Sequence, residues 1–245
     1  MRHKLSFSTV CDKGLIRQIN QDSVYADSDG YNGIFCVADG MGGHSKGELA
    51  SQTIISEIKK AWERFCVLDK KTPFREAFGL FEKALDDANS LIYESYNKES
   101  ICGSTVSLLF VYDDCYGIIN VGDSRIYISQ KKQIVQVTED DVWENLPEQN
   151  GIDKAVLVQS PKYGKLTNSV GTSERVFKKY SICQMQGKQS FLLCSDGLHK
   201  CCDDSLVNSI IIKNRNNPVR VTNNLSDEVY QMGAPDNFSI IYICV

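Results

Sequence analysis

The order in which β-prone and helical segments follow one another constrains the fold of this chain most. Apolar, β-prone runs lie at 5–10, 23–26, 33–38, 105–112, 116–121, 125–137, 190–195 and 238–244. Stretches with helical spacing of apolar residues lie at 45–65, 74–92, 205–212 and 218–232. Strands, two helices, strands, two helices and a final strand predict an α+β fold, a four-layer α-β-β-α sandwich of two antiparallel sheets flanked by helix pairs.

The segment from 139 to 165 is the least regular part of the chain. It contains Pro147, Gly151, Pro161 and Gly164. Strong strand signals precede and follow it, so we expect a surface excursion and not a linker between domains. With 245 residues, the chain is long enough to bury a sizeable core. We therefore expect residues 1–245 to form a single domain.

Composition limits the classes of partner. The formal net charge of −4 argues against a nucleic-acid surface, which normally leaves a basic footprint. An anionic substrate stays compatible with this charge, because a bound cation can invert the local field. The N-terminus lacks the apolar core of a signal peptide, and no apolar run approaches membrane-spanning length. We expect a cytoplasmic monomer whose ten cysteines are reduced, with no membrane or nucleic-acid partner.

Five aspartates occupy the same kind of sequence position: each stands where an apolar, β-prone run stops and a turn begins. They are Asp22, Asp39, Asp123, Asp196 and Asp236. Carboxylates that project from several strand ends can converge, and they then repel one another unless a cation lies among them. All-oxygen ligation suits Mg²⁺, Mn²⁺ or Ca²⁺ better than zinc. Asp-Gly and Asp-Asn also form ordinary turns, but five such positions, three with a glycine beside the aspartate, favour a metal centre.

The segments around these aspartates are similar to those of a known family. They read Arg-Gln-Ile-Asn-Gln-Asp at 17–22, Val-Ala-Asp-Gly-Met-Gly-Gly-His at 37–44, Cys-Gly-Ser-Thr at 102–105, Asn-Val-Gly-Asp-Ser-Arg at 120–125, Leu-Thr-Asn-Ser-Val-Gly at 166–171, Cys-Ser-Asp-Gly-Leu at 194–198 and Pro-Asp-Asn-Phe at 235–238. In this order they resemble the metal-dependent Ser/Thr protein phosphatases, the PPM or type 2C class, in its compact prokaryotic form. The resemblance covers essentially the whole chain and implies the same sandwich fold.

The resemblance implies a centre of two Mg²⁺ or Mn²⁺ ions. Asp39 would bridge the two ions, and the carbonyl of Gly40 would complete one of them, since glycine lets the backbone approach closely. Asp196 and Asp236 would hold the other ion. Asp22 would act mainly through metal-bound water.

Further site residues follow from the same motifs. A third, weaker ion is often held in this family by the aspartates that correspond to Asp123 and Asp196. Arg17 is the candidate phosphate clamp, because its planar guanidinium matches two phosphate oxygens; taken alone, it reads as a surface arginine. His44 is the candidate acid that protonates the departing oxygen. Relatives with a shorter Asp-Gly-His motif place this group where the chain has Met41, so a plain loop histidine remains the alternative.

The implied function is a metal-dependent protein serine/threonine phosphatase. It would hydrolyse phosphoserine and phosphothreonine in substrates of a Ser/Thr kinase, by direct attack of a water bridged between the two ions, and so reverse kinase signalling. A phosphocysteine mechanism is disfavoured because no cysteine lies in a His-Cys-x5-Arg loop. A binding-only pseudophosphatase would have lost metal carboxylates, and all five are present. The acidic charge and the motifs disfavour a nuclease or a small-phosphoester hydrolase.

Overall fold

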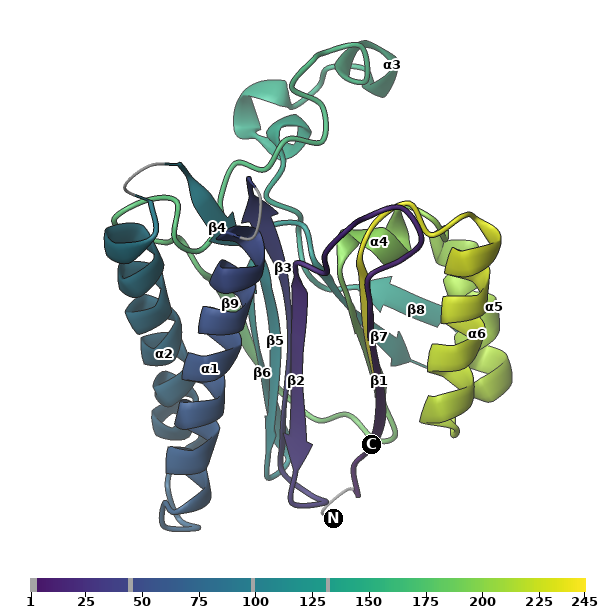
Figure 1. Cartoon of the computed structure of the whole chain (residues 1–245). Helices are drawn as coiled ribbons and strands as arrows, with labels where there is room; N and C mark the ends of the chain where they lie inside the picture. The colour runs from purple at the N-terminus through teal and green to yellow at the C-terminus, as the bar shows by residue number, and fades with distance from the viewer. Residues whose placement is uncertain (1–3, 44–45, 98–99, 131–132) are drawn as a thin grey trace.

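The structure, a computed structural model, describes residues 4–43, 46–97, 100–130 and 133–245. Two antiparallel sheets lie face to face, and each carries a pair of helices on its outer face, as Figure 1 shows. The predicted α-β-β-α arrangement is therefore confirmed. None of the helices in the described ranges combines the length and the apolar composition needed to span a lipid bilayer.

One sheet has the strand order β1-β11-β10-β7-β8, and the other has the order β2-β3-β5-β6-β9 with β4 beside β3. The strands are β1 (Ser6–Asp12), β2 (Asp22–Ser28), β3 (Gly33–Gly42), β4 (Cys102–Ser104), β5 (Val106–Tyr112), β6 (Cys115–Val121), β7 (Arg125–Gln130), β8 (Gln133–Gln136), β9 (Lys179–Gln184), β10 (Ser190–Cys194) and β11 (Phe238–Cys244). The α-helices are α1 (Lys46–Cys66), α2 (Phe74–Ser95), α3 (Lys154–Leu157), α4 (Asp196–His199), α5 (Asp204–Asn214) and α6 (Pro218–Gln231).

Strand β3 shows why the central strands read as continuous apolar runs. Its side chains alternate between the two faces of the sheet. Cys36 and Ala38 pack in the core under α1 and α2, while Phe35 and Val37 pack in the core between the two sheets. Because both faces are covered, both sets of side chains are apolar and fully buried.

All five aspartates lie near strand termini, but three of them differ from the prediction. Asp22 begins β2 and Asp236 precedes β11, so these two stand at the start of a strand and not after one, and Asp39 lies inside β3, which continues to Gly42. The pattern still brings the side chains together, because antiparallel neighbours start and stop at the same edge of a sheet. Asp22, for example, is the register partner of Asp39 on β3.

The segment from 139 to 165 is the expected surface excursion. It contains two short 3-10 turns, Trp143–Asn145 and Pro147–Gln149, and the single turn of α3. In Figure 1 it projects beyond the ends of the sheets, at the same end of the molecule as α4. An isolated bridge between Val142 and Leu166 closes its base. The excursion thus stands beside the aspartate-rich edge.

Candidate metal and active site

A cleft of about 460 Å³ opens at this edge between the two sheets. Its lining includes all but one of the predicted site residues that the structure describes, namely Arg17, Asp39, Gly40, Asp123, Asp196 and Asp236. Asp22 does not line the cleft but lies behind it, beside Asp39 in the β2–β3 pair. The predicted acid, His44, lies outside the described residues, so its role stays a prediction.

The backbone of Asp39 is hydrogen-bonded to the last residue of β4, Ser104, and to Thr105, which precedes β5. Its N–H donates to Thr105 Oγ1 at 3.0 Å, and its carbonyl accepts from Thr105 N at 2.9 Å and from Ser104 Oγ at 3.0 Å. The next residue must be glycine, because a Cβ on Gly40 would lie 2.0 Å from the carbonyl oxygen of Gly47. This arrangement fixes the main chain and leaves the Asp39 carboxylate to the cleft.

Asp22 is a buried carboxylate in which one oxygen has hydrogen-bond donors and the other has none in the described part of the chain. Ser195 Oγ and Ser239 Oγ donate to its Oδ2 at 2.7 Å and 2.8 Å. Among the described residues, no group hydrogen-bonds to the buried Oδ1. Burial raises the pKa of Asp22 to about 6, against the two hydroxyl donors that lower it. An orphaned carboxylate oxygen in this position is the kind of group that a cation or its hydration water satisfies.

The carboxylates also perturb one another. Burial holds the pKa of Asp39 well above its usual range, and the charges of Asp22, Asp196 and Asp123 add to the effect. Burial together with Asp196 raises the pKa of Asp123 to about 6. Oxygen donors that repel one another in a cleft fit a site for hard divalent cations.

The carboxylates are nevertheless not yet in a ligand arrangement. Within the described ranges, no group of three or more His, Cys, Asp or Glu side chains is placed to hold a metal ion. Two of the aspartates turn to basic side chains instead: Asp236 to Arg17, and Asp196 to Lys200.

Arg17 lies at the mouth of the cleft. Its Nη2 donates to Asp236 Oδ2 at 2.8 Å, and the two side chains are 52% and 31% exposed. This contact is the main reason that the pKa of Arg17 is raised. Asn237 ties the loop down, because its Nδ2 donates to the carbonyls of Lys13 and Ile19 at 2.8 Å and 3.0 Å. Arg17 is thus an anchored cation next to a predicted ligand.

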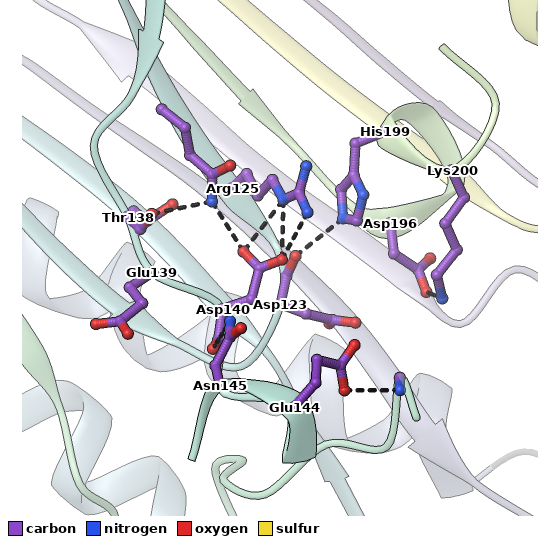
Figure 2. A network of polar contacts seen from close by, with 12 residues as sticks. Asp123, Arg125, Thr138, Glu139, Asp140, Glu144, Asn145, Asp196, His199 and Lys200 are labelled. Carbon is purple, nitrogen blue, oxygen red and sulfur yellow. Dashed lines mark hydrogen bonds and ion pairs between the residues drawn. The ribbon is translucent and has the colours of Figure 1, made fainter. Parts of the chain in front are cut away.

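Figure 2 shows a polar network behind the Asp123 loop. Arg125 donates through Nε and Nη2 to Asp140, with the closest contact to Oδ2 at 2.7 Å. His199 Nε2 donates to the carbonyl of Asp123 at 3.0 Å, and Asn145 Nδ2 donates to the carbonyl of Asp140 at 3.0 Å. The network links the Asp123 loop to the start of the excursion.

Asp141 also supports this loop, although its sequence context suggested no role. Its Oδ2 accepts from Gly122 N at 3.0 Å, and its own N–H donates to the carbonyl of Gly122 at 2.9 Å. Lys179 on β9 forms an ion pair with Asp141 at 2.7 Å. Two lysines of the cleft, Lys165 and Lys200, were likewise missed, because single lysines in a surface segment carry no distinguishing signal.

Comparison with known proteins identifies the family of this chain. Residues 17–228 match the family model for protein phosphatase 2C, and the chain therefore belongs to the protein phosphatase 2C family. The serine/threonine phosphatase stp of Listeria monocytogenes is 27% identical over 95% of this chain and 92% of its own length. The serine/threonine protein phosphatase PstP of Mycobacterium tuberculosis is 26% identical over 97% of this chain, which spans only 44% of that relative.

Solved structures share the architecture. The crystal structure of the M. tuberculosis phosphatase PstP superposes with a TM-score of 0.84 over 98% of each chain, at 24% identity. The catalytic domain of PstP in complex with two manganese ions superposes with a TM-score of 0.79 over 99% of each chain, at 26% identity. The order of layers described above is thus that of known phosphatases of this family.

Proposed function

We propose that this protein is a Mg²⁺- or Mn²⁺-dependent protein serine/threonine phosphatase acting on phosphoserine and phosphothreonine. The observation that carries the proposal is the convergence of four aspartates from both sheets on one cleft, with a fifth, Asp22, behind it carrying an orphaned buried oxygen, and with Arg17 at the mouth. Membership of the protein phosphatase 2C family and the manganese ions of a solved relative support it.

The proposed ligands divide by position. Asp39 would bridge two ions and the Gly40 carbonyl would complete one, while Asp196 and Asp236 would hold the second. Asp22, recessed behind the cleft, would act through water. When bound, the two divalent cations neutralise charge on the phosphoryl oxygens and lower the pKa of a water molecule enough to supply a nucleophile at neutral pH.

The protein itself supplies orientation. Thr105 and Ser104 hold the Asp39 backbone, and Asn237 holds the loop that carries Arg17. We propose that the Arg17 guanidinium binds two phosphate oxygens of the substrate and shares or gives up Asp236 as it does so. His44 is the proposed donor of the proton to the departing serine or threonine oxygen.

The setting of this activity is also a proposal. We infer that residues 1–245 form one catalytic domain that acts as a cytoplasmic monomer on phosphorylated proteins and reverses the action of a Ser/Thr kinase. The acidic net charge and the ten cysteines, which are all free thiols in the structure, support this placement.

The test is hydrolysis of a phosphothreonine peptide with Mn²⁺ or Mg²⁺ and with EDTA. We expect turnover with either ion and none with EDTA, because repelling carboxylates do no chemistry without a cation. Asp39→Asn, which keeps the shape but removes a charge, is the inactive control. Full activity in metal-free buffer, or no activity with either ion, would contradict the proposal.

A further inference from the structure

Lys200 is a basic residue inside the carboxylate cluster. It directly follows α4, one helical turn after Asp196, and its Nζ forms an ion pair with Asp196 Oδ2. The side chain lines the same cleft as Asp39 and Asp123. Figure 2 shows Lys200 and Asp196 beside the Asp123 loop. Lysine and aspartate four apart are common on helix surfaces, so the question is whether this pair is more than a surface contact.

The surroundings of Lys200 separate it from an ordinary surface pair. Lys200 lines one cleft together with three carboxylates, those of Asp196, Asp123 and Asp39. Its partner Asp196 is largely buried, with a side chain 15% exposed, while the Lys200 side chain reaches the surface and is 57% exposed. By contrast, Lys83 on α2 pairs with Asp87 away from this cleft, and both side chains of that pair are largely exposed, at 66% and 47%.

We propose that the Lys200 ammonium occupies the place between Asp123 and Asp196 that a third divalent ion would otherwise take. The inference rests on the proposed function, since it assumes that two ions occupy the rest of the cleft. It departs from the expectation of a third ion at these two aspartates: in this chain the third cation would be a side chain, and the centre would hold two metal ions.

The charges in the cleft agree with this count. The four aspartates of the cleft and Asp22 behind it carry five negative charges, Lys200 offsets one, and two divalent cations would offset the other four. Arg17 and Lys165, which line the same cleft, would then remain for the two negative charges of a phosphate monoester. A third divalent ion would leave the centre with excess positive charge next to Lys200, which is costly in a partly buried site.

The experiment counts Mn²⁺ ions by isothermal titration and by anomalous scattering from soaked crystals. The parent protein is compared with Lys200→Met, which keeps the length of the side chain without its charge. Lys200→Arg keeps the charge, and Lys83→Met removes a lysine from a matched pair far from the cleft. We expect two ions in the parent, Lys200→Arg and Lys83→Met, and a third ion in Lys200→Met beside Asp123 and Asp196.

A further variant checks the position of the added ion. Adding Asp123→Asn to Lys200→Met should return the count to two, because it removes one of the two carboxylates of the uncovered site. Retention of the parental unfolding temperature shows that Lys200→Met is folded; Lys200→Gln serves if it is not. A third ion between Asp123 and Asp196 in the parent, or only two ions in both neutral variants, overturns the inference.

The result also separates this inference from the proposed function. If the parent binds two ions and hydrolyses the phosphopeptide, but the neutral variants gain no ion and lose only kcat/KM, Lys200 is a phosphate-binding residue and this inference alone fails. If the parent binds no Mn²⁺ and hydrolyses nothing, the proposed function fails and the inference fails with it.

Discussion

Two clusters of charge lie side by side at one end of the molecule, and their difference is instructive. In the Arg125–Asp140 network, the guanidinium meets its carboxylate through two nitrogens, and further donors satisfy the same aspartate. In the cleft, four aspartates, with Asp22 buried behind them, face Arg17, Lys165 and Lys200 among the residues that the structure describes. A cluster in which positive and negative charges are matched supports the structure around it. A cluster with an excess of one charge favours the binding of a ligand of opposite charge.

The two arginines show the same contrast in single side chains. Arg125 and Asp140 are only 23% and 10% exposed, and the pair holds the base of the excursion. Arg17 is half exposed and meets Asp236 through Nη2. Loss of Arg125 should therefore lower the stability of the fold, and loss of Arg17 should weaken substrate binding.

The largest expected effect is at the cleft. Asp39→Ala and Asp196→Ala should each lower kcat/KM by at least about 1000-fold, on the order of 4 kcal/mol in transition-state free energy, because each removes a proposed direct ligand. The metal-free variants should unfold at the same urea concentration as the parent or a higher one, since a repulsive charge is gone. Normal turnover with two ions bound to Asp39→Ala would show that Asp39 is not a required ligand and would contradict the assignment of the cleft as the metal site.

The next effect is on stability and belongs to the network. Arg125→Met should lower the free energy of unfolding by about 3 kcal/mol, because it leaves Asp140 partly buried without its cation. Adding Asp140→Leu should recover part of this loss, since both charges are then absent. Urea unfolding of the two single variants and the double variant measures the coupling. Strictly additive losses would mean that the two side chains do not act as a pair.

Arg17 should give a smaller effect, and on catalysis only. Arg17→Ala should lower kcat/KM for a phosphopeptide by about 10- to 100-fold through KM, which corresponds to a contact of about 1.5–3 kcal/mol. Arg17→Lys should recover part, because it supplies the charge without the planar fork. Urea midpoints and Mn²⁺ affinity should stay near those of the parent. Weakened Mn²⁺ binding would instead place Arg17 in the scaffold that orients Asp236.

The smallest effect concerns pH. Asp22 and Asp123 have pKa values of about 6 in the fold, above the ordinary 3.8, so the folded chain holds their protons at pH values where the unfolded chain has lost them. Stability therefore falls as the pH rises from about 4 to 6. The metal-free protein should melt a few degrees higher at pH 5.5 than at pH 7.5. Asp123→Asn should reduce this difference, and an unchanged difference would exclude Asp123 as a source.

Much of the fold was readable from the sequence, because the central strands are buried on both faces. The run 33–38 is apolar at every position and the run 238–244 at every position but Ser239, and both are too short for buried helices. The neighbours of each strand were not readable. The pairing of β1 with β11 joins residues more than 200 positions apart, and nothing local in either strand encodes it.

The aspartates of the site were predictable from their motifs, but their partners were not. Asp22 and Asp236 stand at the start of their strands. In an antiparallel sheet the start of one strand lies beside the end of its neighbour, so both kinds of position reach the same edge, and the sequence pattern does not distinguish them. Asp140, Asp141 and Lys200 look like ordinary surface residues in sequence. Their importance comes from contacts across the fold, to Arg125, to Gly122 and to the carboxylates of the cleft.

The pairing of the first strand with the last has a consequence for synthesis. Asp236 and β11 leave the ribosome long after Arg17, Asp22 and Asp39. The sheet that contains β1 cannot close around β11 until translation has passed these positions, and contacts of such sequence separation form slowly. A nascent chain of this protein can therefore carry most of its fold without a complete cleft, and the proposed activity has to wait until β11 has been made.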